Sequence, residues 1–286
     1  LDFHADMDDY FEAKARLFTP ALASQGVVCV DDEWGQRLAR VAGVPVTTVG
    51  SASADWTRVD EHVDVSGGRC TLIDPAGLRH DLEVAIPGRF NLSNAASAYV
   101  ALVTVGIDPA AARAGIAALT AVPGRMERVD EGQPFLAVVD YAHTPDAVTT
   151  LLEEARALAA PAGKVLVVLG CGGDRDRGKR PLMGAAAARH ADLAVLTNDN
   201  PRSEDPEAIL AAMAEGAVGG ADVIVLPDRR EAIALAVERA ARGDVVVIAG
   251  KGHEQGQEYA DRTLPFDDRV ELRNALRSRG YVAGVA

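Results

Sequence analysis

The chain has 286 residues, 48% of them hydrophobic, and this length exceeds the usual size of one domain, so we expect two domains. The formal net charge of −13 repels a phosphate backbone, and we expect no nucleic-acid partner. No apolar run approaches the roughly 20 residues of a membrane span, so we expect no membrane insertion. Three scattered cysteines indicate neither a disulfide framework nor a zinc site and favour a cytoplasmic setting.

The part of the chain up to residue 122 predicts a mixed α/β arrangement. We expect helices over Asp6–Leu17, Glu33–Ala42, Ser93–Val105 and Pro109–Ala118, and strands over Gly26–Val30 and Pro45–Val49. Three further extended segments are expected around Val63, Leu72 and Leu82–Ile86. Turn residues between the extended segments predict antiparallel strands. Asp108 is placed to cap the last helix, and Asn91 or Asn94 to cap the one before it. Pro123 and Gly124 interrupt the helical pattern, which places a domain boundary between residues 122 and 123.

Residues 123–286 alternate strands and helices, as in a doubly wound, Rossmann-like domain. The expected strands are short, Val-rich runs: Leu136–Asp140, Lys164–Leu169, Leu193–Thr197, Val223–Leu226 and Val245–Ala249. The expected helices lie between them: Pro145–Ala159, Arg180–Arg189, Pro206–Gly216 and Arg229–Arg242. Ligands gather at the carboxyl ends of strands in such sheets, and polar loops follow four of these strands.

One of these loops, residues 170–181, is rich in glycine and basic side chains and leads from a strand into a helix. Its backbone amides and charges predict a site for a phosphate or a carboxylate, while an exposed turn with mixed charges is the plain alternative. Gly173 to Lys179 match the start of a P-loop, but Arg180 stands where a P-loop needs a hydroxyl for magnesium. We therefore reject the P-loop interpretation.

Four segments, in this order, resemble the Mur ligase family and within it the UDP-N-acetylmuramoyl-tripeptide synthetases of the meso-diaminopimelate-adding type: residues 140–146, 170–175, 199–202 and 250–254. Upstream, residues 87–94 resemble the family's asparagine-bearing segment near the adenine, and residues 123–127 its hinge into the third domain. Residues 1–14 resemble the segment with its carbamylated lysine. The resemblance covers nearly the whole chain.

The resemblance implies a three-domain enzyme with a UDP-binding, a central ATPase and an amino-acid-binding domain. Residues 1–122 would be the later part of the central domain, and residues 123–286 the amino-acid-binding domain. The chain begins without Met, so we expect a fragment that lacks the first domain and the central P-loop and is inactive alone. The implied reaction uses ATP and Mg²⁺ to join meso-diaminopimelate to a UDP-N-acetylmuramoyl dipeptide, and we expect a monomer.

The resemblance also implies roles at the nucleotide. Lys14, as a carbamate, would hold Mg²⁺ and serve catalysis, although an ordinary exposed helix lysine is the plain alternative. Asn94 would contact the adenine, with Arg125 and His143 near the phosphates and His143 also catalytic. Asp140 would order the loop between them.

At the amino-acid site, Arg202 and Asn200 would bind the distal carboxylate, because a guanidinium grips that group with two parallel hydrogen bonds. Arg175 would bind the other carboxylate. Glu254 and the backbone of Gly250 would hold the distal ammonium, which needs an acceptor where water is excluded.

Two rival interpretations remain, and a third conflicts with the sequence. A folylpolyglutamate synthetase-like ligase would share the fold and the ATP chemistry without needing the Arg202 loop. An inert fragment would retain only the amino-acid pocket. A stand-alone P-loop ATPase would rest on residues 173–179 and conflicts with Arg180.

Overall fold

The computed structural model describes residue 4 and residues 6–282, and the chain divides into two compact units, Leu1–Thr120 and Ala121–Ala286. The expected boundary between residues 122 and 123 lies beside this division. The motif at residues 1–3 lies outside the described residues.

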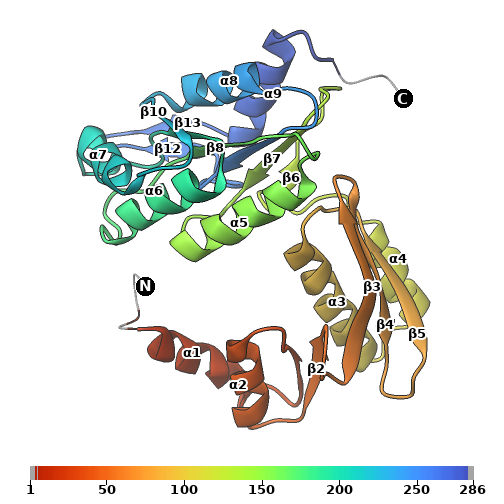
Figure 1. The fold of residues 1–286 in the computed structure, drawn as a ribbon. Helices are drawn as coiled ribbons and strands as arrows, with labels where there is room; N and C mark the ends of the chain where they lie inside the picture. The colour runs from red at the N-terminus through yellow and green to blue at the C-terminus, as the bar shows by residue number, and fades with distance from the viewer. Residues whose placement is uncertain (1–3, 5, 283–286) are drawn as a thin grey trace. The chain divides into compact units, whose positions relative to one another are not determined.

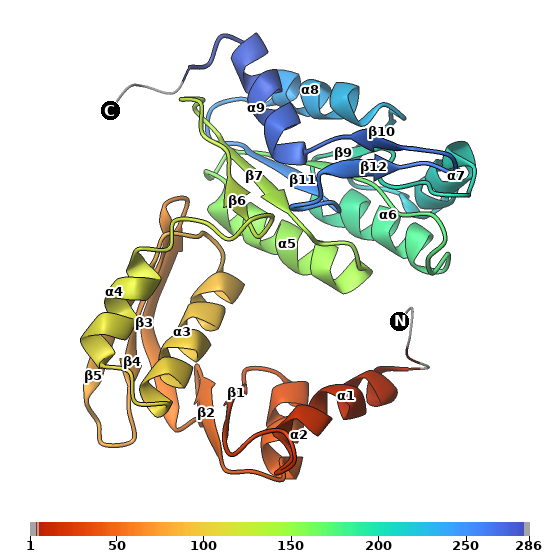
Figure 2. The ribbon, with the colours of Figure 1, turned by 180° about the vertical axis from the view of Figure 1, so that it is seen from behind.

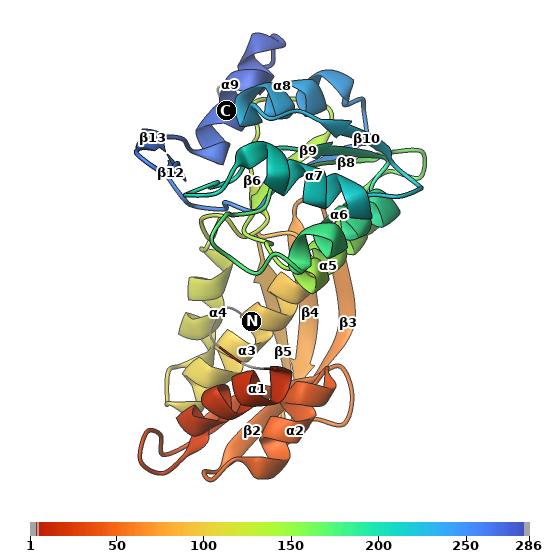
Figure 3. The same cartoon turned by 90° about the vertical axis from the view of Figure 1, so that its left-hand side faces the viewer.

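The first unit is built on a five-stranded sheet in the order β1-β2-β3-β4-β5 (Figure 1). Its strands are β1 (Gly26–Cys29), β2 (Val46–Gly50), β3 (Trp56–Asp64), β4 (Gly67–Ile73) and β5 (Arg79–Val84). The first three strands are parallel, and β3, β4 and β5 are antiparallel neighbours, which confirms the antiparallel prediction. Its helices are α1 (Met7–Ala15), the 3₁₀ turn η1 (Arg16–Phe18), α2 (Glu33–Val41), α3 (Arg89–Thr104) and α4 (Pro109–Ala117). Helix α3 packs along the sheet and α4 against β5, as Figure 3 shows from the side.

Helix α3 begins four residues earlier than the sequence predicts, at Arg89 instead of Ser93. The expected asparagine cap is wrong, because the Asn91 side chain lies inside the helix and donates to the Pro87 carbonyl oxygen at 2.8 Å. Gly88 precedes the helix with φ +102°, a conformation that glycine adopts without steric cost. The Asp108 cap of α4 is confirmed, since its carboxylate accepts from the amide of Ala111.

The second unit has a six-stranded sheet in the order β10-β9-β8-β11-β7-β6. Its strands are β6 (Glu127–Arg128), β7 (Leu136–Asp140), β8 (Val165–Leu169), β9 (Leu193–Leu196), β10 (Asp222–Val225) and β11 (Val245–Ala249). All neighbours are parallel except β6 and β7. The helices between the strands are α5 (Pro145–Leu158), α6 (Lys179–His190), α7 (Pro206–Gly216) and α8 (Arg229–Arg239). The predicted doubly wound domain is therefore confirmed.

Helices cover both faces of this sheet, α5 and α6 on one side and α8 and α9 (Asp268–Ser278) on the other (Figure 2). This explains why the central strands are apolar throughout, since each residue is buried whichever way it points. A buried ion pair joins α8 to α9, with Nε and Nη2 of Arg229 each 2.7 Å from a carboxylate oxygen of Asp268. The same guanidinium donates to the Ala249 carbonyl oxygen at 2.9 Å and so fixes the end of β11.

The sequence pattern does not predict the two-residue strand β6, the hairpin β12 (Gly256–Glu258) and β13 (Thr263–Pro265), or helix α9. These strands are too short to show a periodic pattern, and five of the eleven residues of α9 are charged. Within the described ranges, no helix is both long and apolar enough to cross a membrane.

Candidate amino-acid and nucleotide site

The carboxyl ends of four parallel strands meet at one edge of the second sheet. Because β9, β8, β11 and β7 are consecutive neighbours, the loops that follow them lie side by side. These loops span residues 197–205, 170–178, 250–255 and 141–144, and they are the polar loops that the sequence singles out. The topology thus gathers at one edge side chains that are far apart in the sequence.

The loops after β9 and β11 are joined by a network around Asn200. Its amide nitrogen donates to Oε2 of Glu254 at 2.8 Å, and its carbonyl oxygen accepts from Nζ of Lys251 at 2.7 Å. The same oxygen accepts from the backbone amide of Glu258 at 3.0 Å. Lys251 is completely buried, and its ammonium also lies 3.3 Å from Glu254 and 3.6 Å from Asp199. The two predicted residues Asn200 and Glu254 are therefore in direct contact.

Arg202 lies beside this network and is held at two points. Its Nε donates to Oε2 of Glu258 at 2.8 Å, and its Nη1 donates to the Gly173 carbonyl oxygen at 2.8 Å. Its backbone has φ +52°, which is sterically costly for a residue with a side chain. Strained backbone is common at functional sites, and its two hydrogen bonds fix the direction of the Arg202 guanidinium.

Two glycines allow the loops to approach each other. A Cβ on Gly173 would lie 1.9 Å from the Pro201 carbonyl oxygen, so any side chain there would separate the loops after β8 and β9. Gly250 has φ +113°, and a Cβ there would lie 2.6 Å from the Asp199 carboxylate. Gly250 thus lets Asp199 reach the ammonium of Lys251.

The Gly-rich loop is bound to the loop after β9. Arg180 is buried and donates two hydrogen bonds to Glu204, at 2.8 and 3.1 Å. These bonds from Arg180, followed by one from the Asp174 amide, lower the pKa of Glu204 to about 2. Arg180 is therefore a structural residue, in agreement with rejection of the P-loop interpretation. Arg175 is exposed on the same loop, and its guanidinium donates to the Asp174 carbonyl oxygen.

The predicted phosphate-side residues of this unit gather around Tyr141. The Arg125 guanidinium carbon is 5.2 Å from the centroid of the Tyr141 ring, and the His143 ring centroid is 4.7 Å from it. Lys179, at the start of α6, donates to the His143 carbonyl oxygen at 3.1 Å. Burial, then the charges of Glu254 and Asp199, raise the pKa of Tyr141.

Asp140 joins two loop segments of the second unit. Its two carboxylate oxygens accept from the backbone amides of Met126 and Ala142, each at 2.8 Å. It thereby ties the segment that carries Arg125 to the segment that carries His143. Burial raises its pKa, and these hydrogen bonds partly offset that effect.

The two remaining predicted residues, Lys14 and Asn94, belong to the first unit. Lys14 is exposed on α1, with Nζ 5.3 Å from the centroid of the Tyr10 ring. Asn94 is exposed on α3, next to Ser93. The hydroxyl of Ser93 accepts from Arg58, which also pairs with Asp31.

Among the residues that the structure describes, no three His, Cys, Asp or Glu side chains form a group that could hold a metal ion. A carbamate on Lys14 would offer oxygen ligands, and Mg²⁺ commonly takes its other ligands from phosphates and water.

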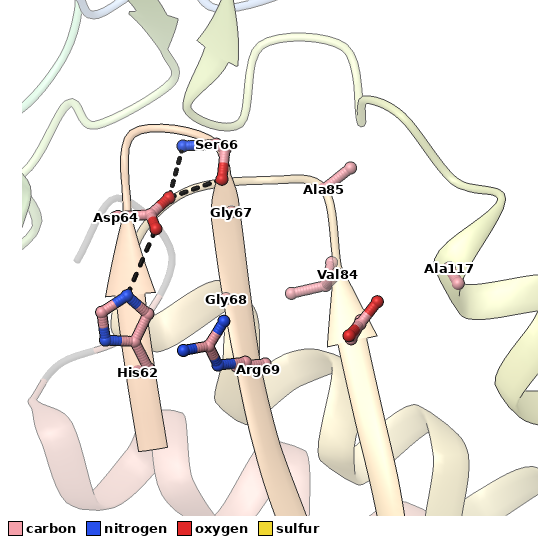
Figure 4. A pocket seen from close by; sticks show the side chains of 10 residues that line it. His62, Asp64, Ser66, Gly67, Gly68, Arg69, Val84, Ala85 and Ala117 are labelled. Carbon is pink, nitrogen blue, oxygen red and sulfur yellow. Dashed lines mark hydrogen bonds and ion pairs between the residues drawn. The ribbon is translucent and has the colours of Figure 1, made fainter.

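A separate pocket of about 300 Å³ lies in the first unit beside the turn between β3 and β4 (Figure 4). The Asp64 carboxylate fixes this turn by accepting from the amide and the hydroxyl of Ser66. Gly67 has φ +145°, and a Cβ there would lie 2.1 Å from the Val84 carbonyl oxygen. None of the predicted site residues lines this pocket.

Four residues of the site have no role predicted from the sequence: Lys251, Asp199, Glu258 and Tyr141. Lys251 had one usable signal, since it stands between two glycines directly after a buried strand. The contacts of Glu258 had none, because β12 was not predicted.

Two family models match the chain: the Mur ligase middle domain over residues 1–102, and the Mur ligase, glutamate ligase domain over residues 124–252. The chain belongs to the Mur ligase family, as its motifs predict.

The chain is similar to UDP-N-acetylmuramoyl-L-alanyl-D-glutamate--2,6-diaminopimelate ligase of Streptomyces coelicolor, with 53% identity over 285 residues, which are 97% of this chain and 56% of that protein. The protein of the same name from Corynebacterium glutamicum is 49% identical over 292 residues, covering 98% of this chain and 56% of its own length. The chain thus spans about half the length of the curated relatives it matches.

A solved structure with that name has a TM-score of 0.64 at 38% identity and covers 98% of this chain and 58% of its own. Folylpolyglutamate synthase of Mycobacterium tuberculosis, solved with ADP and AMPPCP, has a TM-score of 0.67 at 23% identity over 87% of this chain and 58% of its own. The second likeness is one of fold alone.

Proposed function

We propose that the protein carrying this chain uses ATP to join meso-2,6-diaminopimelate to UDP-N-acetylmuramoyl-L-alanyl-D-glutamate in peptidoglycan synthesis. The observation that carries the proposal is the clustering of Asn200, Arg202 and Glu254 at the carboxyl edge of one sheet. The names of the relatives at 53% and 49% identity support the same reaction.

The cluster offers complementary charges to a diamino dicarboxylate. Glu258 and the Gly173 carbonyl oxygen accept from Nε and Nη1 of Arg202, so Nη2 and the second hydrogen of Nη1 would form a forked pair with the distal carboxylate. Oε2 of Glu254 accepts from Asn200 and Lys251. The other carboxylate oxygen and the backbone of Gly250 would accept hydrogen bonds from the distal ammonium. Arg175 would bind the second carboxylate.

The proposed chemistry has two steps. The γ-phosphoryl group of ATP passes to the terminal carboxylate of the UDP-linked dipeptide, and ADP leaves. The amine of diaminopimelate then attacks the acyl carbon, loses a proton and expels phosphate. Arg125, His143 and Lys179 would stabilise negative charge on the transferring group, which is the main demand of phosphoryl transfer. The proposed contact of Asn94 with the adenine rests on the resemblance of its segment.

Mg²⁺ would neutralise the nucleotide phosphates when bound, and a carbamate on Lys14 would supply oxygen ligands to it. We further propose that the protein acts in the cytoplasm as a monomer. The free thiols of Cys29, Cys70 and Cys171 agree with a reducing compartment.

A ligand-dependent melting experiment on this chain separates the proposal from a folylpolyglutamate synthetase-like ligase. A ligand at 100 times its Kd stabilises the folded state by about 2.7 kcal/mol. We expect meso-diaminopimelate to raise the melting temperature, and glutamate to leave it unchanged. Stabilisation by glutamate alone would contradict the proposal and favour the folate-type ligase.

A further inference from the structure

Lys251 is a charged side chain with no exposed surface, which is costly unless partners hold the charge. Its Nζ donates to the Asn200 carbonyl oxygen at 2.7 Å and lies 3.3 Å from Glu254 and 3.6 Å from Asp199. Lys251 has no surface open to solvent, so it is not placed to touch a ligand. All its partners, however, belong to the loops that carry the proposed amino-acid site.

The ammonium fixes which way the Asn200 amide points. An ammonium only donates, so it accepts no bond from the amide nitrogen and requires the carbonyl oxygen on its side. The backbone amide of Glu258 donates to the same oxygen at 3.0 Å and enforces the same orientation. The amide nitrogen is then directed at Glu254, which it reaches at 2.8 Å.

The effect of Lys251 extends to Arg202 through Glu258. The Glu258 backbone is bonded to Asn200, its carbonyl oxygen accepts from the Arg202 amide at 3.0 Å, and its carboxylate accepts from Nε of Arg202 at 2.8 Å. The buried Lys251 ammonium is thus linked, directly or through Asn200 and Glu258, to the residues proposed to bind both distal groups of the amino acid.

We propose that Lys251 is a positioning residue for the distal end of the amino acid, a role that rests on the proposed function. It holds Asn200 in one amide orientation and fixes one oxygen of Glu254, so that the other oxygen faces the ligand. Lys251 takes no part in the phosphoryl transfer or in the attack of the amine.

The test is steady-state kinetics on the protein as its gene encodes it, with Lys251→Met as the variant and Lys164→Met, an exposed lysine of the same unit, as the control. Loss of a hydrogen bond from a charged group predicts a rise in the KM for meso-diaminopimelate of roughly tenfold or more. The KM for ATP should stay unchanged in both variants. In an Asn200→Ala background, Lys251→Met should add little, because its effect passes through Asn200.

Other outcomes separate the two proposals. If the unaltered protein forms no product with meso-diaminopimelate, the proposed function fails and this inference falls with it. If the unaltered protein is active and folded Lys251→Met keeps its KM, or raises the KM for ATP equally, Lys251 does not position the amino acid. Should Lys251→Met fail to fold, the double variant Lys251→Met/Asp199→Asn removes one charge of each sign, and its KM decides the question.

Discussion

Replacing Arg202 with Ala tests the link between one side chain and the choice of amino acid. The Arg202 side chain is 24% exposed, and its guanidinium is held by Glu258 and Gly173 in a defined direction. Arg202→Ala removes the partner of the distal carboxylate of diaminopimelate. Lysine lacks this carboxylate, so its own use should change little.

The magnitude follows from the burial of the site. A hydrogen bond to a charged group contributes about 1.5–3 kcal/mol, and partial exposure of Arg202 favours the lower half of that range. A loss of about 2 kcal/mol corresponds to roughly a 30-fold rise in Kd. Arg202→Lys should recover only part of this loss, because a point charge does not reproduce the forked geometry.

The assay is the kinetics of the encoded protein with meso-diaminopimelate and with lysine, supported by melting curves for each variant. We expect kcat/KM for diaminopimelate to fall and that for lysine to hold or improve. An equal loss toward both amino acids in a folded variant would refute the reasoning, because Arg202 would then not discriminate between them.

Four further predictions concern other parts of the chain. Gly173→Ala places a Cβ 1.9 Å from a carbonyl oxygen of the facing loop and should push the two loops apart. Calorimetry should then show a lower affinity for diaminopimelate in the folded variant, and an unchanged affinity would contradict the loop contact. Asp268→Asn weakens the buried partner of Arg229, and urea titration should show a loss of about 3–5 kcal/mol in the free energy of unfolding; a loss near zero would count against this ion pair. With ¹³C-bicarbonate and Mg²⁺, the encoded protein should give a carbamate carbon signal that Lys14→Arg lacks, and a bare lysine in well-resolved density of that complex would remove the assignment. Burial raises the pKa of Asp31, but hydrogen bonds from Ser51 and Arg58 lower it to about 2, below the ordinary 3.8. The ionised carboxylate therefore stabilises the folded state above about pH 4, and this stabilisation is lost as the pH falls through 2. When the pH is lowered from 5 to 3, the urea midpoint should fall less in Asp31→Asn than in the unaltered protein.

The second unit could be predicted from the sequence because its signals are local. Short apolar strands alternate with helices, and Thr144 caps α5 by accepting from the amide of Ala147. The start of α3 could not be predicted, because the Asn91 side chain bonds backward to Pro87 instead of capping the helix.

The site was predicted where a residue type implies its chemistry and missed where a contact joins distant segments. Arginines and a glutamate in loops after strands predict an ionic ligand, and Arg202 and Glu254 lie at that sheet edge. Lysine is rarely buried, so nothing local indicates that Lys251 has no exposed surface. Its partners Asn200 and Asp199 lie about fifty residues upstream and meet it only because β9, β8 and β11 are neighbours.

The central claim is tested most directly by the mass of the product. The encoded protein is incubated with ATP, Mg²⁺, UDP-N-acetylmuramoyl-L-alanyl-D-glutamate and an equimolar mixture of meso-diaminopimelate, lysine and glutamate, and the UDP-linked products are resolved by mass spectrometry. The account predicts one dominant product, the dipeptide extended by a single diaminopimelate, with ADP and phosphate formed in equal amounts. A product extended by lysine or glutamate instead, or ATP hydrolysis without any extended product, would contradict it.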